Sequence, residues 1–146
     1  MSRVRVCPDS NIFCRGILAQ WGAPKAVLIL AASSLFDLVL LEPVVDEVEG
    51  ALAPYGQAID DFHKLLRLCR ITHVRSPSKE ELVEYEYLLP YLRHLNDLPI
   101  IVSAISVSLD WFLSDNVSHF SQELAEVTGI KIVSSIEFLR QLIIPR

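Results

Sequence analysis

Short apolar runs alternate along the chain with longer segments that have the periodicity of helices. The runs are rich in β-branched, aromatic and leucine side chains, which is typical of buried strands. The predicted strands are Val4–Cys7, Phe36–Leu41, Ile71–Val74, Trp111–Leu113 and Lys131–Val133. The predicted helices are Asn11–Trp21, Lys25–Ser34, Pro43–Leu52, Gln57–Cys69, Ser78–Arg93, Leu98–Leu109, Ser121–Thr128 and Ser134–Leu142. Strands that alternate with helices predict one α/β domain over residues 1–146, with a mostly parallel sheet of about five short strands flanked by helices.

Residues at the helix ends support these boundaries. The sequences Ser78–Glu81 and Ser134–Glu137 fit the capping box S-x-x-E, and Gly129 is suited to close the helix before it. Pro90 is expected to kink or shorten its helix, because proline lacks the backbone N–H of a helix interior. The third predicted helix has an apolar stripe at amphipathic spacing: Val44, Val45, Val48, Ala51 and Leu52.

Composition narrows the class of protein. Hydrophobic residues make up 51% of the chain and the mean hydropathy is +0.37, yet the longest apolar runs, Ala26–Phe36 and Leu98–Leu109, are shorter than the ~20 residues of a membrane helix. Buried helices, or a helix pair in a dimer interface, account for the hydropathy. The N-terminus turns polar too soon for a signal peptide. The cysteines lack a CxxC pair, which predicts reduced thiols in a cytoplasmic protein: Cys7, Cys14 and Cys69.

Two acids follow predicted buried strands. Asp9 comes directly after the first strand, and Asp115 comes just after Trp111–Leu113. Ligands gather at the carboxyl ends of parallel strands, so both acids are candidates for a functional site. Asp97 opens the helix before Trp111–Leu113 and is a third candidate. A turn or N-cap role suits Asp9 equally well, and helix capping suits Asp97.

Periodicity leaves the role of the other charged residues open. Glu47 and Glu49 flank the apolar stripe of their helix on opposite sides, and the pattern does not choose between them. A formal net charge of −5 argues against a nucleic-acid interface over the whole surface. The one sizeable basic cluster is formed by Lys64, Arg67 and Arg70. Solvated surface is the commoner role of such a face, and contact with a phosphate backbone is the alternative.

Four acids in order, with a closing strand and helix, together resemble the PIN domain family over nearly the whole chain. Asp9-Ser10-Asn11 is similar to the family's opening D-[ST]-N, and NDLPIIVSA, which contains Asp97, is similar to its D-D-x-x-x-x-A pattern. DWFLS followed by Asp115 resembles the fourth motif, and KIVSSIEFL resembles the closing strand and helix. The family's helical glutamate lies about five residues before an aliphatic residue, and this selects Glu47, with Leu52 as the aliphatic.

The resemblance implies a Rossmann-like three-layer fold and a Mg²⁺- or Mn²⁺-dependent nuclease. Carboxylates without cysteine or histidine suit such hard ions. The implied catalytic and metal-binding residues are Asp9, Glu47, Asp97 and Asp115, supported by Ser10, Asn11, Asn116 and Ser118. Similarity to small standalone members, such as the toxins of toxin–antitoxin pairs, implies an RNA substrate, an antitoxin partner and a homodimer. Many members carry a further acid shortly after the fourth one, whereas this chain has Val117 and Ser118 there.

Two other classes of protein compete with this interpretation. A PIN-like interaction module without metal affinity would explain the missing further acid, although all four core acids are retained. A phosphoacceptor receiver domain is also α/β with an acidic pocket. It requires an acid pair after the first strand and a lysine after the last strand. Here Ser10 follows Asp9, and Lys131 lies before or within the last strand. His119, close to Asp115, is expected to be structural or to face solvent.

Overall fold

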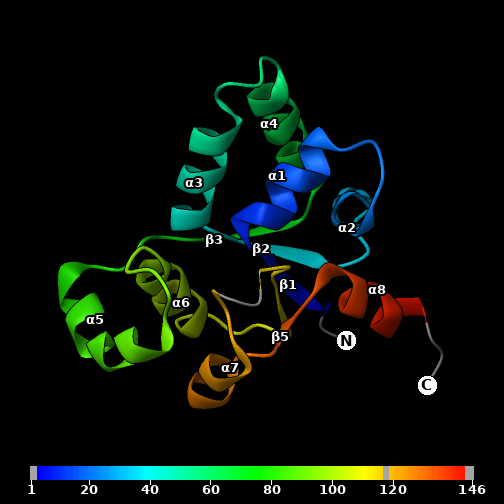
Figure 1. Cartoon of the computed structure of the whole chain (residues 1–146). Coiled ribbons are helices and arrows are strands. Elements are labelled where there is room, and N and C mark those ends of the chain that lie inside the picture. Colours follow the sequence, from blue (N-terminus) through cyan, green and yellow to red (C-terminus); the bar gives the residue numbers. More distant parts are fainter. Residues whose placement is uncertain (1–2, 117–118, 144–146) are drawn as a thin grey trace.

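The computed structural model describes residues 3–116 and 119–143, which form layers of helices around one parallel sheet (Figure 1). The strands are β1 (Arg5–Pro8), β2 (Asp37–Leu41), β3 (Ile71–Val74), β4 (Trp111–Leu113) and β5 (Ile132–Val133). All four pairings are parallel, and the strand order is β3-β2-β1-β4-β5. The predicted α/β class and the five-stranded sheet are therefore confirmed.

The strand order identifies the edge of the sheet at which a ligand is expected. The chain moves outward from β1 through β2 to β3 and then returns to place β4 on the other side of β1. The point of reversal therefore lies between β1 and β4, and open α/β sheets bind ligands beside the carboxyl ends of the strands there. The order differs from the 2-1-3-4-5 order of flavodoxin-like folds such as receiver domains. The receiver interpretation is thus wrong.

The helices cover both faces of the sheet (Figure 1). On one side lie α1 (Ser10–Leu18), α2 (Ala23–Ala32), α3 (Glu42–Leu52) and α4 (Ala58–Leu68). On the other side lie α5 (Lys79–Glu84), the 3₁₀ helix η1 (Glu86–Tyr91), α6 (Asp97–Ile105) and α7 (Gln122–Thr128). The last helix, α8 (Ser135–Ile143), packs beside α2 and β4. This placement follows from right-handed crossovers, because the chain crosses the sheet in opposite directions before and after β3.

The core explains the high hydropathy of the chain. The central strands are almost fully buried, and α6 is buried over most of its length, including Ile100, Ile101 and Val102. T-shaped contacts between phenylalanines fasten helices to this core: Phe13 meets Phe62 at 5.4 Å between ring centroids, and Phe36 meets Phe138 at 5.3 Å. Within the described residues no helix combines the length and the apolar character that crossing a bilayer requires.

Several predicted boundaries need correction. The first helix ends at Leu18 rather than Trp21, and the chain turns before Gly22, whose φ of 118° suits glycine. The helix predicted to reach Arg93 ends at Glu84 and is followed by η1, which contains Pro90. Ala51 is exposed although it falls within the predicted stripe of α3.

The two predicted capping boxes behave differently. The box at Ser78 and Glu81 is complete, with both reciprocal bonds present. At α8 only one half of the box is seen: Ser134 Oγ accepts a hydrogen bond from the Glu137 N–H at 3.1 Å, and the Glu137 carboxylate binds Arg140 at 3.2 Å. A capping box in the sequence therefore located both helix starts, but a nearby cation changed the role of the second glutamate.

The close contact between α1 and α2 predicts opposite effects of two glycine-to-alanine substitutions. A Cβ atom at the buried Gly16 would overlap Leu28 Cδ1 and lie 2.9 Å from Leu28 Cγ and 3.1 Å from the Pro24 carbonyl oxygen. We expect Gly16→Ala to lower the free energy of unfolding by about 1–3 kcal/mol, the usual cost of overpacking. A Cβ atom at Gly50 in α3 would meet no atom within 4 Å. Gly50→Ala should therefore raise the free energy of unfolding by about 0.5–1 kcal/mol, because alanine has the higher helix propensity.

Urea unfolding of both variants and the parent measures this difference. Equal effects of the two substitutions would show that α1 and α2 are not packed as closely as described.

Candidate acidic site

Asp9 lies at the carboxyl end of the central strand β1 and is only 4% exposed. Its carboxylate accepts a hydrogen bond from the Ser10 N–H at 2.8 Å and from the Ser114 hydroxyl at 3.4 Å. Burial raises the pKa of Asp9 to about 6; the Ser10 bond opposes this rise, and the negative charges of Glu47 and Asp97 add to it. Asp9 is also the N-cap residue of α1, so the local role that its sequence allowed is present as well.

Glu47, and not Glu49, points its charge toward this buried acid. Partial shielding of the carboxyl from water raises the pKa of Glu47, although the residue as a whole is exposed. A hydrogen bond from Ser10 opposes the rise and the charge of Asp97 adds to it. Glu49 instead lies beside His63, with 2.8 Å between Oε2 and Nε2. The two glutamates that periodicity could not separate therefore have different surroundings.

Asp97 is the first residue of α6 and is 5% exposed. Its Oδ2 lies 3.2 Å from Nδ1 of His119, yet among the described residues no hydrogen bond of regular geometry reaches this oxygen. Burial raises the pKa of Asp97, while positive charge on His119 and His94 opposes the rise. The N-cap residue is Asn96, whose side chain makes no capping hydrogen bond, and Asp97 lies in the first turn of the helix, where a negative charge is favourable.

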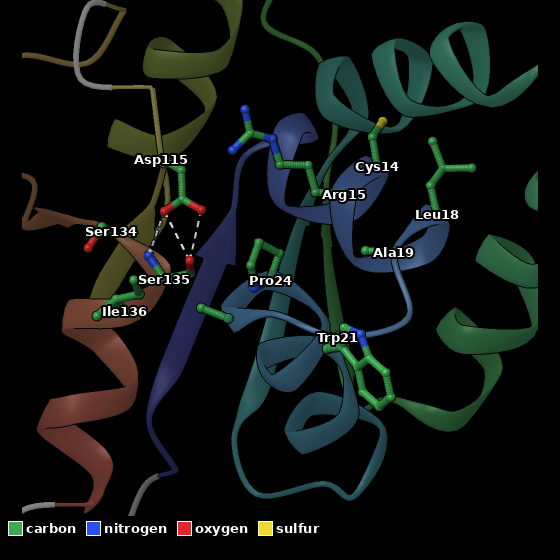
Figure 2. Close-up of a pocket in the computed structure, with 11 residues that line it drawn as sticks. Cys14, Arg15, Leu18, Ala19, Trp21, Pro24, Asp115, Ser134, Ser135 and Ile136 are labelled. Atoms are coloured by element: carbon green, nitrogen blue, oxygen red, sulfur yellow. Dashed lines mark hydrogen bonds between the residues drawn. The ribbon is translucent and has the colours of Figure 1, made fainter.

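Asp115 has a different set of contacts. It follows β4, and its carboxylate accepts hydrogen bonds from the N–H and the hydroxyl of Ser135, the hydroxyl lying within reach of both oxygens (Figure 2). The Ser135 N–H donates at 2.8 Å, and its hydroxyl lies 3.0 and 2.8 Å from the two oxygens. Ser135 is the first residue of α8 and is 1% exposed. Asp115 thus ties the end of β4 to the start of α8, because it occupies a helix N-terminus that needs acceptors.

The structure therefore brings three of the four predicted acids into electrostatic contact. The charges of Glu47 and Asp97 act on Asp9, and the charge of Asp97 acts on Glu47. Asp115 is linked to Asp9 through its neighbour Ser114, whose hydroxyl binds the Asp9 carboxylate. Over residues 3–116 and 119–143, no three His, Cys, Asp or Glu side chains stand close enough to enclose a metal ion as they are placed.

The residues expected to support the acids have separate positions. Ser10 connects two acids: its N–H binds Asp9 and its side chain binds Glu47. Asn11 follows in the first turn of α1 and is partly buried. The N–H of Asn116 donates to Ser114 Oγ at 3.1 Å. Ser118 lies outside the described residues.

A groove of about 820 Å³ opens beside Asp115 (Figure 2). It lies between the α1–α2 turn and the start of α8, and its lining is mostly apolar. Trp21 is 83% exposed at this groove, and Leu18 and Ile136 are also exposed. The Arg15 side chain extends from α1 toward the side of the groove on which Asp115 lies (Figure 2). The groove therefore offers a cation and an apolar surface next to a carboxylate.

The predicted basic face lies on α4 and on the residues that follow it. Lys64, Arg67 and Arg70 are all exposed. Arg70 Nε lies 3.3 Å from Oδ1 of Asp37, the first residue of β2. Because the strands are parallel, the start of β2 lies at the edge of the sheet opposite to the carboxyl ends. Arg70 is thus remote from the acids.

Three residues that contact the acids at this edge were not among the predicted site residues. His119 was expected to be structural or solvent-facing, but its ring lies against Asp97. Ser114 and Ser135 are buried hydroxyls that bind Asp9 and Asp115. No local pattern marks these contacts, because Ser114 and Asp9 are 105 positions apart in the chain. The sequence pattern instead indicated the neighbouring Ser134, as the first residue of a capping box.

Comparisons with solved structures give the same fold. The chain superposes with a TM-score of 0.63 on a chain of VapBC2 from Rickettsia felis, in a crystal structure with a DNA fragment from the promoter; identity is 16%, and the match covers 90% of this chain and 98% of that one. It superposes with a TM-score of 0.60 on a chain of FitAB bound to the IR36 DNA fragment, with 15% identity and coverage of 89% and 94%. No family model and no curated protein matches the sequence. The resemblance to PIN domains is thus confirmed for the fold.

The raised pKa of Asp9 predicts how the stability of the metal-free protein depends on pH. Between pH ~4 and ~6 the folded protein keeps a proton that the unfolded chain releases. The free energy of unfolding should therefore fall as pH rises through this window, by roughly 2–3 kcal/mol from this group. Asp9→Asn should remove this fall and should be more stable than the parent at pH 7 in the absence of metal.

Urea unfolding in a chelator at several pH values between 4 and 8 measures the difference between parent and variant. Asp46→Asn is the matched control, because Asp46 is an exposed acid on the neighbouring helix. A difference profile for Asp9→Asn as flat as that of the control would contradict the prediction.

Proposed function

We propose that this chain is a metal-dependent endoribonuclease that hydrolyses RNA phosphodiester bonds at the acidic site, and that it is the toxin of a toxin–antitoxin pair. Asp9, Glu47, Asp97 and Asp115 are the proposed catalytic and metal-binding residues. The observation that carries the proposal is the mutual repulsion of Asp9, Glu47 and Asp97 at the carboxyl edge of the sheet, beside its switch point.

The residues present fit a divalent cation. Asp97 Oδ2 is a buried oxygen without a regular hydrogen bond among the described residues, and such an atom gains most from a cation. Burial raises the pKa of Asp9, Glu47 and Asp97, and neighbouring negative charge adds to the rise at Asp9 and Glu47, so a bound cation would favour the ionised form of each. Oxygen donors suit Mg²⁺ or Mn²⁺, which are commonly held by one or two carboxylates, several waters and substrate phosphates. A site of this kind needs no complete cage of protein ligands.

Each acid would have its own role in holding the ion and the substrate. When bound, a divalent ion makes a water molecule more acidic and stabilises the leaving oxygen of a phosphodiester. Burial fixes the positions of Asp9 and Asp97. Ser10 would keep Asp9 and Glu47 close to each other, because it forms hydrogen bonds with both carboxylates. Asp115 is held by Ser135, so it would act through water or by orienting the neighbouring loop. Asn11, Asn116 and Ser118 are proposed to support these groups.

Contacts with RNA are proposed for two groups of cations. Arg15 extends toward the Asp115 side of the groove and is placed for a phosphate next to the acids. Lys64, Arg67 and Arg70 would contact the backbone farther along, because Arg70 lies at the opposite edge of the sheet.

A protein partner is proposed as well. Solved structures with this fold include VapBC2 and FitAB, each bound to a DNA fragment, and the resemblance to standalone PIN proteins implies an antitoxin. The apolar groove beside Asp115, with the exposed Trp21, is suited to cover by such a partner, which would also obstruct the acids. Homodimer formation and a cytoplasmic location belong to the same proposal.

Metal binding and cleavage together test the proposed function. We expect millimolar Mg²⁺ or Mn²⁺ to raise the melting temperature of the parent, because an ion that binds only the folded state stabilises it. The Asp9→Asn/Asp115→Asn double variant should show no such rise. Asp97→Asn should fold and should lose metal-dependent cleavage of single-stranded RNA.

Two outcomes would contradict this proposal in different ways. Cleavage by Asp97→Asn at the parent's rate would remove Asp97 from the site. A parent that neither binds metal nor cleaves RNA would instead support a PIN-like interaction module.

The different surroundings of the two helical glutamates provide a matched pair of variants. Glu47→Gln should weaken Mn²⁺ binding about tenfold or more, because this charge faces Asp9 and Asp97. Glu49→Gln also removes one negative charge from α3, but Glu49 lies beside His63. This variant should leave the Mn²⁺ affinity unchanged. Isothermal titration calorimetry compares the two. The reverse ranking would move the ligand to Glu49.

A further inference from the structure

The contact between His119 and Asp97 has an unusual geometry for two groups so close together. His119 Nδ1 lies 3.2 Å from Asp97 Oδ2, yet Oδ2 accepts no regular hydrogen bond from any described residue. The two atoms are therefore in contact, and the interaction with His119 opposes the rise in the pKa of Asp97, but Oδ2 is not aligned for a regular hydrogen bond. Asp97 is 5% exposed, so water cannot freely compensate its oxygen. When the ring is neutral and its proton lies on Nε2, Nδ1 and Oδ2 are two electron-pair donors that face the same small region.

The spacing of these two atoms matches that of neighbouring ligands around a metal ion. Adjacent ligands of an octahedral ion with bonds of ~2.1 Å lie about 3.0 Å apart. Adjacent ligands of a tetrahedral ion with bonds of ~2.0 Å lie about 3.3 Å apart. The observed 3.2 Å falls between these values.

The surroundings hold the His119 ring at this place. The ring of His94 packs against it, with 4.6 Å between the ring centroids, and the centroid of the Phe120 ring lies 6.3 Å away. The His119 side chain keeps 27% of its surface exposed, so an ion and its waters can reach the pair. The charges of Glu47 and of His119 also act on each other, which places the pair beside the acids already described.

We propose that His119 Nδ1 and Asp97 Oδ2 form a nitrogen–oxygen ligand pair for a divalent transition-metal ion at the acidic site. The inference rests on the proposed function, in that the ion is the one the acids are proposed to hold. It adds a ligand of a different chemical type, which the carboxylates alone do not provide. Waters and substrate phosphates would complete the coordination, so the pair does not require a third side chain within reach.

The nitrogen ligand has a consequence for the choice of metal. Carboxylate and water ligands suit Mg²⁺ and Mn²⁺ alike, whereas imidazole favours transition ions. A site made only of acids would thus discriminate weakly between Mg²⁺ and Mn²⁺. A site that includes His119 should bind Mn²⁺ distinctly more tightly than Mg²⁺. The position also compensates for the acid that is missing after Asp115, since His119 brings a donor from the same loop.

Calorimetric titration of the full chain with Mn²⁺ and with Mg²⁺ tests the inference without any activity assay. His119→Gln should lower Mn²⁺ affinity at least about tenfold and leave Mg²⁺ affinity within about threefold, since losing even an outer partner of a metal costs about that much or more. His73→Gln is the matched control, because it removes an exposed imidazole on the edge strand β3, away from Asp97 and His119. It should keep the Mn²⁺ preference.

Electron paramagnetic resonance of Mn²⁺ bound to the parent provides a second measurement that needs no variant. Pulsed spectra should contain a coupling to a directly bound nitrogen, and His119→Gln should lose it. If the parent binds both ions, but shows no nitrogen coupling and the same preference as His119→Gln, the inference is overturned and the acid site stands. If the folded parent binds neither ion, and Asp97→Asn behaves identically, the proposed metal site itself fails together with the inference.

Discussion

A carboxylate held out of water at the end of the central strand is the constraint on which this edge of the molecule depends. Asp9 is buried between helices on both sides of the sheet, and its pKa is raised because burial disfavours the charged form. Glu47 and Asp97 reach the same place from α3 and α6, helices that follow and precede different strands. The fold thus maintains a concentration of negative charge that hydrogen bonds from Ser10 and Ser114 offset only in part.

The sheet order determines which segments can supply these groups. Since β1 lies between β2 and β4, the loops that leave β1 and β4 are adjacent, and the helix that follows β2 packs beside them. The relative positions of these loops depend on helices that hold their places on the sheet. Dense packing provides this rigidity, through the close contact of α1 with α2 at Gly16 and the phenylalanine contacts of α4 and α8.

Asp115 shows how one acid of a set can have a structural task. Its carboxylate accepts the first N–H of α8 together with the Ser135 hydroxyl, so it positions the helix that forms one side of the apolar groove. Asp115 and its neighbour Ser114 therefore connect the groove to the acids, because Asp115 lines the groove and Ser114 binds Asp9. A molecule that fills the groove lies directly against residues that lead to Asp9. This connection relates partner binding to the acidic site in the proposed function.

Local pattern determined much of the fold. Period and length located all five strands, because a buried parallel strand is a short apolar run whose ends are marked by polar residues. The Ser78 capping box and Gly129 also located helix ends, since capping involves residues only a few positions apart. The local pattern was wrong about the end of α1, which is Leu18 rather than Trp21. It was also wrong about the burial of Ala51, which is exposed. The motifs indicated which acids to consider, although periodicity alone left Glu47 and Glu49 equal.

Only the tertiary structure decided what each of these acids touches. Hydrogen bonds and close ion contacts require atoms about 3–4 Å apart, and the partners of Asp9, Asp97 and Asp115 come from segments far apart in the chain. The sequence by itself determined the strands, the helix types and the presence of acids at strand ends. Which acid binds Ser135 and which histidine lies beside Asp97 depended on how the helices pack against the sheet, because packing fixes the direction of each side chain.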